Sequence, residues 1–294
     1  MSREPSSSFC DLGGPVHFLE WAGPPASPIV CLHAVGGSAL LWRGVAPALA
    51  AHGRVLALDQ AGFGETPRAG RSAAVEPAHQ LLSRFLRATS ARPAVLVGHS
   101  MGGAVALLQA AREPGSVRGL VLSSSLLPAA FEGASDRAAV ARYLRLRAEM
   151  RARAARRSLT RRPTLERVVA DGLRGAAAEP DAVDDLLIED SLALVRAGGR
   201  RESAAAFAQA ARSTFALVTR PRRFRQVLDR VECPVLVLHG GRDRTIPLAF
   251  AQRAVRDHPG WRLEVFPELG HMLQLEDPAG WSSAVGRWLA ECER

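Results

Sequence analysis

Short apolar runs that alternate with helical patterns limit, more than any other feature, how this chain can fold. The strand-like runs are compact and mostly apolar at consecutive positions: 16–21, 29–32, 55–58, 95–97, 120–122, 235–238 and 263–266. Consecutive apolar residues are typical of strands that are buried on both faces. Helical patterns lie between or after them, at about 39–51, 101–112, 248–255 and 278–289. This alternation predicts the α/β class, with a mostly parallel sheet covered by helices on both faces.

The segment 128–231 interrupts the alternation. It contains no convincing strand, is rich in Ala, Arg and Leu, and is divided by Pro and Gly residues into several helical stretches. A chain of 294 residues has room for one large domain with an insertion. We therefore predict a core formed by 1–127 and 232–294, with 128–231 inserted as a helical cap. Residues 1–8 are polar, and we expect them to be frayed.

The pentapeptide Gly98-His99-Ser100-Met101-Gly102 carries the strongest chemical signal. It places G-x-S-x-G directly after a buried strand and directly before a helix. A sharp strand-to-helix turn strains the backbone of the central residue, and the small residues on either side let the turn pack. The hydroxyl then projects from the carboxyl edge of the sheet, at a helix N-terminus that favours negative charge. We expect Ser100 to be a nucleophile, and the alternative is a serine that only caps the helix.

Two loops that follow later strands supply the partners of such a nucleophile. A serine hydroxyl needs a base, and the base needs an acid to orient it. Asp243 lies in the loop after the strand 235–238, and His271 lies in the loop after the strand that ends at Phe266. Sites in parallel sheets are built where strands reach their carboxyl ends. We therefore predict that Ser100, Asp243 and His271 form a catalytic triad.

On these motifs and on the order of the three residues, the chain resembles the α/β-hydrolase superfamily along nearly its whole length. Within this superfamily, the chain looks like the serine hydrolases of the esterase and lipase type that have a helical cap. Residues 33–37 look like the family's H-G-x-x-G loop, and residues 59–66 look like its D-x-x-G-x-G-x-S/T loop. The resemblance implies an oxyanion hole made by the backbone N–H groups of Val35 and Met101. Ala34 departs from the usual glycine and adds a Cβ atom where the backbone must approach the substrate.

Other polar residues near the strand ends are expected to have structural roles. His99 should diverge from its neighbour Ser100 across the sharp turn, and Asp59 should brace its own loop. His33 and His239 lie at strand ends, where histidines more often brace loops than catalyse. The remaining histidines fall in hairpin or helix contexts and are expected at the surface: His17, His52, His79 and His258.

A serine nucleophile limits the chemistry that the family resemblance allows. Relatives with an Asp nucleophile, the epoxide hydrolases and haloalkane dehalogenases, form an ester on their own carboxylate, which Ser100 cannot do. We expect a carboxylic ester or lactone hydrolase that works through an acyl-enzyme on Ser100, with His271 as base and then acid, and without a cofactor. One alternative is a carbon–carbon bond hydrolase of the meta-cleavage product type. A less favoured one is a binding protein of this fold without turnover.

The charge of the chain is concentrated in the predicted cap. All 38 basic residues are arginine, and the net charge is +9. Residues 128–231 hold 21 Arg against 13 Asp and Glu, and residues 142–162 hold nine Arg against the single acid Glu149. Because the charge is confined to the cap and no nucleic-acid motif accompanies it, we expect no nucleic-acid partner. The stretch 142–162 is either a solvated helix face or a surface for an anionic partner.

The remaining composition bears on metals and location. The four cysteines are scattered, without the spacing of a zinc site or of a disulfide scaffold, and no metal is expected. The first residues contain no apolar signal core, and no apolar stretch is long enough to cross a membrane. We expect a cytoplasmic protein, without stable membrane insertion, that acts on a small, largely apolar ester or lactone.

Overall fold

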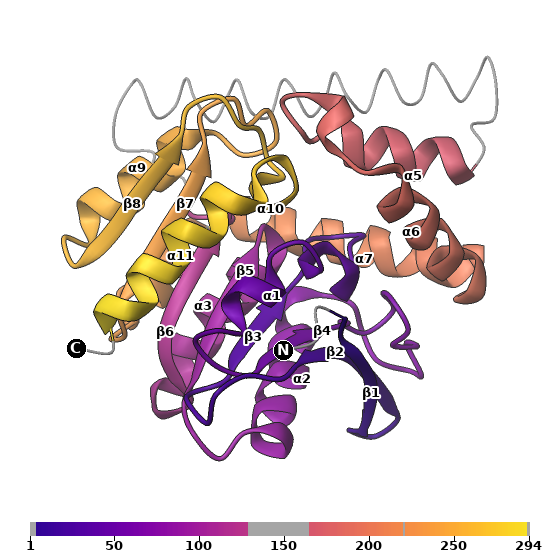
Figure 1. Ribbon diagram of the computed structural model, residues 1–294, viewed down its shortest axis with the longest axis horizontal. Helices are drawn as coiled ribbons and strands as arrows, with labels where there is room; N and C mark the ends of the chain where they lie inside the picture. The colour runs from indigo at the N-terminus through magenta and orange to yellow at the C-terminus, as the bar shows by residue number, and fades with distance from the viewer. Residues whose placement is uncertain (1–3, 129–164, 220, 293–294) are drawn as a thin grey trace.

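An eight-stranded sheet forms the centre of the protein in the computed structural model, which describes residues 4–128, 165–219 and 221–292 (Figure 1). The strands lie in the order β1-β2-β4-β3-β5-β6-β7-β8. Only β1–β2 and β2–β4 pair antiparallel, and all pairs from β4 to β8 are parallel. The mostly parallel sheet that the sequence predicts is therefore confirmed. The strand bounds are β1 (Ser6–Asp11), β2 (Pro15–Trp21), β3 (Ile29–Leu32), β4 (Val55–Leu58), β5 (Ala94–His99), β6 (Val117–Ser123), β7 (Val235–Gly240) and β8 (Trp261–Phe266).

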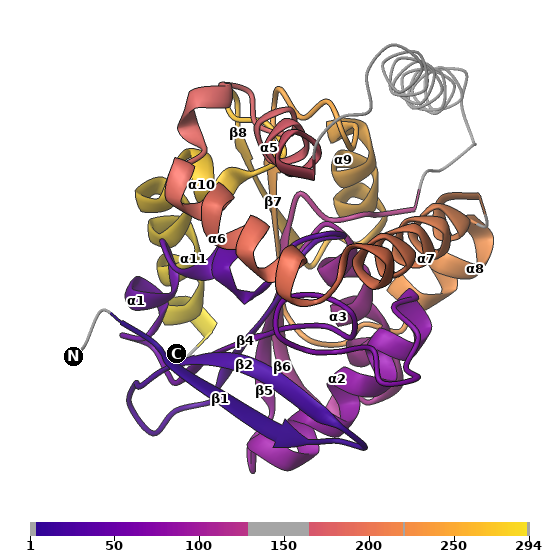
Figure 2. The same ribbon diagram turned by 90° about the vertical axis from the view of Figure 1, so that its right-hand side faces the viewer.

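Helices cover both faces of this sheet, as Figure 2 shows. Alternate residues of each strand point to opposite faces, so Val30 and Leu32 join one core cluster while Ile29 and Cys31 join the other. Both clusters are closed by helices, which explains why β3 and β4 are apolar at every position. The first face carries α2 (Val75–Thr89), α3 (Met101–Arg112) and α9 (Leu248–Asp257). The second face carries η1 (Ala39–Trp42), α1 (Ala46–Leu49) and α11 (Pro278–Cys292).

Two local expectations are wrong. The helix expected at about 39–51 is divided into η1 and α1, and Pro47 stands at the start of α1. A proline inside a helix removes a backbone hydrogen bond, so one continuous helix cannot run through this position. The polar residues expected to be frayed form the edge strand β1 from Ser6 onward, paired in register with β2.

The described helices between β6 and β7 fall inside the predicted cap range. They are α5 (Leu165–Arg174), η3 (Pro180–Ala182), α6 (Asp185–Ala197), α7 (Arg200–Thr219) and α8 (Pro221–Leu228). Helix α7 is fastened to the core because Gln209 Oε1 accepts a hydrogen bond from the Ala73 amide (2.9 Å) and Ser213 Oγ accepts one from the Val75 amide (3.1 Å). The last helix, α8, packs against α3 and buries Phe224 in the main core cluster.

The arginine-rich stretch 142–162 lies outside the described residues. Among the residues that the structure describes, no helix combines the length and the apolar character needed to cross a bilayer. The cytoplasmic location stays a prediction.

Candidate active site

Ser100 lies at the sharp turn between β5 and α3. Its backbone has φ +54° and ψ −113°, a region that residues other than glycine rarely adopt. The turn is closely packed, since a Cβ atom on Gly98 would come within 2.5 Å of Gly103 Cα and one on Gly102 would collide with the carbonyl oxygen of Leu32. The small residues on either side of Ser100 thus have the packing role that the motif predicts.

Asp243 and His271 are hydrogen bonded in the loops after β7 and β8. His271 Nδ1 donates to Asp243 Oδ2 over 2.8 Å, and Asp243 Oδ1 accepts from the amides of Thr245 (2.7 Å) and Ile246 (2.8 Å). Both side chains are buried. Because the carboxylate keeps the proton on Nδ1, Nε2 of His271 is left as the basic atom.

The electrostatic surroundings keep Asp243 ionised. Burial alone would raise the pKa of this carboxyl, but the electrostatic attraction and hydrogen bond of the His271 ring, the nearby His239 ring and the hydrogen bond from the amide of Ile246 together hold the pKa below its usual value. An ionised carboxylate fixes the tautomer and orientation of the imidazole beside it.

His99 links the Ser100 turn to the His271 loop. Its Nε2 donates to the main-chain oxygen of His271 over 2.9 Å, and the two ring centroids are 4.9 Å apart. The amide of Ser100 in turn donates to the main-chain oxygen of Ser123 at the end of β6 (3.1 Å). Since β5, β6, β7 and β8 are consecutive in the sheet, all three predicted triad residues come to one edge.

Glu276, in the short helix α10 (Leu273–Glu276), holds the loop of His271 against the cap. Its Oε2 accepts hydrogen bonds from the amides of Gly270 (2.9 Å) and Ala178 (2.8 Å), and its Oε1 accepts one from the amide of Met272 (3.0 Å). The amide of His271 donates to the main-chain oxygen of Ala176 (2.9 Å). Glu276 could not be predicted from the sequence, because a carboxylate that binds only backbone amides leaves no pattern of side chains to find.

The two predicted oxyanion donors lie on adjacent loops. Val35 follows β3 in a turn that is closed by a hydrogen bond from the Gly37 amide to the Ala34 oxygen (3.0 Å), with Gly36 at φ +79°. Met101 is the first residue of α3, where backbone N–H groups have no partner within the helix. Because β3 and β5 are neighbours in the sheet, both loops reach the edge where Ser100 lies. The donor roles of Val35 and Met101 stay predictions.

Helix α7 brings one aromatic side chain of the cap to this edge. A Cβ atom on Gly36 would lie 3.0 Å from the ring of Phe207, so the ring rests on the turn that contains Val35. The side chain of Phe207 is 51% exposed. Its neighbour Ala206 is fully buried, which anchors the helix at this point.

The histidines at the strand ends brace loops, as expected. His33 donates from Nδ1 to the Ala34 oxygen (2.7 Å) and accepts at Nε2 from the Gln60 amide (3.0 Å). His239 Nε2 donates to the Ile246 oxygen (3.0 Å). Burial lowers the pKa of His33 and His239, so both rings are neutral at neutral pH.

Asp59 also braces its loop, whereas two histidines differ from expectation. The Asp59 carboxylate accepts hydrogen bonds from the amides of Ala39 (2.6 Å) and Glu65 (2.9 Å).

His17 and His79, expected at the surface, are buried. In the described part of the chain, no group of three or more His, Cys, Asp or Glu side chains is arranged to hold a metal ion.

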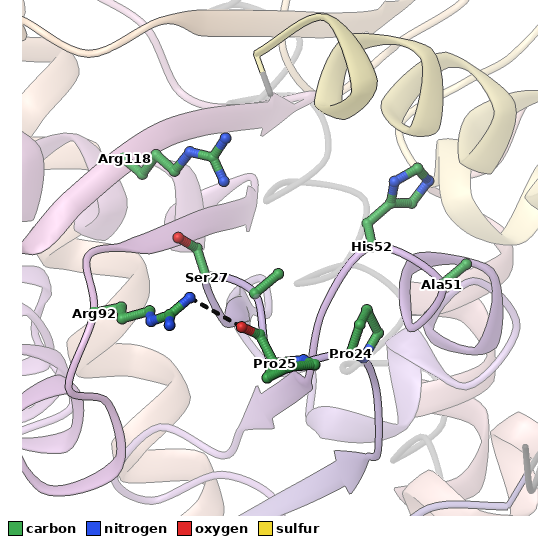
Figure 3. A pocket seen from close by; sticks show the side chains of 8 residues that line it. Pro24, Pro25, Ser27, Ala51, His52, Arg92 and Arg118 are labelled. Carbon is green, nitrogen blue, oxygen red and sulfur yellow. Dashed lines mark hydrogen bonds between the residues drawn. The ribbon is translucent and has the colours of Figure 1, made fainter. Parts of the chain in front are cut away.

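A pocket of about 480 Å³ lies at the opposite end of the sheet (Figure 3). It is lined by Arg92, which precedes β5, by Arg118 near the start of β6, and by His52. The Arg92 guanidinium donates to the main-chain oxygen of Pro25 (2.9 Å). Since these residues lie at the amino ends of the strands, this pocket is separate from the edge that carries Ser100.

Comparison with known proteins gives the family. Residues 27–278 match the profile of the alpha/beta hydrolase fold. The chain is 31% identical to the dihydrolipoyllysine-residue acetyltransferase component of the acetoin cleaving system of Pseudomonas putida, over 94% of this chain and 67% of that protein. It is also 31% identical to the 2-hydroxy-6-oxo-2,4-heptadienoate hydrolase of Pseudomonas putida, over 90% of this chain and 89% of that protein.

Solved structures agree on the fold. A serine hydrolase involved in carbazole degradation superposes with a TM-score of 0.75 at 21% identity, over 97% of this chain and 99% of that one. The match to the family profile extends from the loop before β3 to the start of α11 and so includes the Ser100 turn and the loops of Asp243 and His271. The chain belongs to the α/β-hydrolase family.

Proposed function

We propose that the protein is a serine hydrolase that cleaves a carboxylic ester or lactone of a small, largely apolar acid. The observation that carries the proposal is the buried Asp243–His271 hydrogen bond at the same edge of the sheet as the strained turn of Ser100. A hydroxyl at a helix N-terminus, an imidazole with a free Nε2 and an orienting carboxylate are the groups that acyl transfer requires.

The reaction then follows from these atoms. Ser100 Oγ forms a bond to the substrate carbonyl carbon while His271 Nε2 takes the hydroxyl proton. The carbonyl oxygen becomes an oxyanion that accepts hydrogen bonds from the amides of Val35 and Met101. Collapse of this intermediate breaks the ester C–O bond, and His271 returns its proton to the departing alcohol. Water, activated by the same imidazole, releases the acid from Ser100.

Carbon–carbon bond cleavage is a second candidate function. The observation in its favour is the likeness to a 2-hydroxy-6-oxo-2,4-heptadienoate hydrolase, of which the chain covers 89%. The same serine, histidine and aspartate could serve it, with a carbon leaving group in place of an alcohol. The two functions therefore differ in the substrate they accept rather than in the residues they need.

Activity of the wild type and of Ser100→Ala on one panel of substrates tests both candidates. The panel contains nitrophenyl esters of graded chain length, lactones and a dienoate ring-cleavage product. We expect ester or lactone turnover by the wild type and a loss of at least about 1,000-fold in Ser100→Ala. Ser124→Ala is the control, because Ser124 directly follows the neighbouring strand β6 and also has a positive φ (+40°). It should retain activity within about tenfold.

The outcomes separate the candidates. Strong turnover of the dienoate with little ester hydrolysis would replace the first proposal by the second. Full activity of Ser100→Ala would overturn both. A wild type that neither turns over the panel nor reacts with a fluorophosphonate at Ser100 would indicate a binding protein of this fold.

A further inference from the structure

Ser7, His17 and Asp59 form a second hydrogen-bonded chain of hydroxyl, imidazole and carboxylate. Ser7 Oγ lies 2.9 Å from His17 Nε2, and His17 Nδ1 lies 2.7 Å from Asp59 Oδ2. Ser7 comes from the edge strand β1, His17 from its neighbour β2, and Asp59 follows β4. These three residues lie at the β1 end of the sheet, whereas Asp243 and His271 follow β7 and β8 at the other end of the strand order.

The imidazole and carboxylate are built as in the Asp243–His271 pair. The side chains of His17 and Asp59 are 3% and 2% exposed. The Asp59 carboxylate accepts two backbone amide hydrogen bonds besides the one from His17. Because a buried carboxylate at 2.7 Å holds the proton on Nδ1, Nε2 accepts the hydrogen bond from the Ser7 hydroxyl. This is the arrangement that activates a serine.

The hydroxyl of Ser7 can be reached from solvent, because Ser7 is exposed on the edge strand β1. Phe9, two residues further along the same face of β1, packs its ring 5.0 Å from the His17 ring and is 54% exposed. Glu65 Oε1 lies 3.5 Å from His17 Nε2, so a carboxylate lies beside the atom that would take the Ser7 proton. An apolar reagent can therefore approach Ser7 beside an aromatic ring.

We propose that Ser7 is a second nucleophile, which is acylated by small activated aryl esters. Ser7 Oγ forms a bond to the acyl carbon as its proton moves to His17 Nε2. The bond from the acyl carbon to the aryloxide then breaks, and His17 gives its proton to the aryloxide. Ser7 lies in a strand rather than at a helix N-terminus, so it lacks the oriented amides that speed acyl release at Ser100. The expected product is a lasting acyl-serine rather than turnover.

Acetylation of the Ser100→Ala protein by p-nitrophenyl acetate tests this proposal. The chain contains no lysine, so lysine amines do not compete for the reagent. Peptide sequencing by mass spectrometry locates the acetyl group, with Ser6 and Ser8 in the same strand as internal controls. A positioned general base contributes on the order of 100-fold, so Ser7 should be acetylated about 100 times faster than Ser6 or Ser8. Adding Ser7→Ala should remove the adduct, and adding His17→Gln should lower the Ser7 rate to that of its neighbours.

Even acetylation of Ser6, Ser7 and Ser8 would overturn the proposal, and so would a fast Ser7 rate that survives in a folded His17→Gln protein. If His17→Gln does not fold, the ratio of the Ser7 rate to the Ser6 and Ser8 rates still decides. The result does not depend on the proposed function, because Ser100 is absent from every protein in the experiment.

Discussion

His99 Nε2 donates a hydrogen bond to the main-chain oxygen of His271, 2.9 Å away. The residue directly before the proposed nucleophile thus holds the loop of the proposed base. The ring of His99 is fully buried. Burial, reinforced by the nearby His271, lowers the pKa of His99 to about 3. A ring that stays neutral can donate this hydrogen bond throughout the neutral pH range, so His99 acts on His271 by position rather than by proton transfer.

The buried histidines predict how stability depends on pH. An unfolded histidine has a pKa of about 6.5, whereas burial lowers the pKa of His33, His99 and His239 in the folded protein. Between the two pKa values the unfolded chain binds more protons, so the free energy of unfolding falls as the pH falls below about 6.5. Each such histidine contributes up to about 1.4 kcal/mol per pH unit. Urea unfolding at pH 7, 6 and 5 measures the slope.

His99→Gln identifies one contribution to that slope. The variant removes one proton that only the unfolded chain binds, so the slope below pH 6 should decrease by about 1.4 kcal/mol per pH unit. The absolute stability at pH 7 is a separate quantity and is expected to fall, because the buried hydrogen bond to His271 is disturbed. Equal slopes in the wild type and the variant would show that His99 titrates alike in both states.

Glu276→Gln is predicted to impair turnover more than substrate binding. In the wild type, both carboxylate oxygens of Glu276 accept hydrogen bonds from backbone amides. In the variant, the side-chain N–H₂ group replaces one of these acceptors, so a donor would face a donor. We expect kcat to fall by about tenfold or more as the loop of His271 loosens, with a smaller change in KM. Hydrogen exchange should quicken in 176–178 and 270–272 together.

A matched substitution controls for the change of charge. Glu264, on β8, forms an ion pair with Arg287 on α11. Glu264→Gln should leave kcat within about twofold, as is usual for exposed ion pairs. Faster exchange in only one of the two segments of Glu276→Gln would show that Glu276 does not hold them as a unit.

Gly270→Ala should disturb both folding and activity. Its new Cβ atom would collide with the backbone of Ala178, so the cap segment or the His271 loop must shift. Overpacking of this kind costs about 1–3 kcal/mol of stability. Gly260→Ala is the control, because nothing lies within 4 Å of the added atom. The measurement is the thermal unfolding temperature and the kcat/KM of each variant. Similar losses of stability and of activity in both variants would contradict the prediction.

Phe207→Ala is predicted to change substrate preference. The ring rests on the turn that contains Val35, so its loss removes an apolar wall beside the proposed oxyanion donor. We expect kcat/KM to fall by about tenfold or more for esters with long apolar acyl chains and to change much less for acetate esters. Leu186→Ala, at a cap residue that is 67% exposed on α6, should alter neither. A uniform loss across all chain lengths would assign Phe207 to the stability of the cap.

The features that the sequence predicts well are those fixed by burial on both faces. The bounds of β3 and β4 agree with the apolar runs, because every residue of these short strands faces a core. The loop of Asp243 could be located for the same reason, since it follows the fully buried strand β7. The loop of His271 follows the edge strand β8, which is only partly buried, and was located from the apolar run that ends at Phe266. Strand order then brings them to one edge with Ser100.

The features that the sequence does not predict depend on contacts between distant segments. Strand β1 is polar because it lies at the edge of the sheet, where one side of the strand has no neighbouring strand, so Ser6–Asp11 lacks an apolar pattern. His17 is buried, and its hydrogen-bond partner Asp59 is 42 residues away in the sequence. Glu276 binds backbone amides, which every residue except proline carries, so no residue type marks its partners.

The strained backbone of Ser100 also affects which residues are favoured at this position during evolution. A φ of +54° suits glycine, and a side chain held there costs on the order of 1–3 kcal/mol. Natural domains are stable by only about 5–15 kcal/mol, so this cost is a substantial fraction of the total. In a lineage that no longer used the hydroxyl, replacement of this serine by glycine would be favoured by stability alone. Position 100 is therefore a place where thermodynamic selection and chemical selection act in opposite directions.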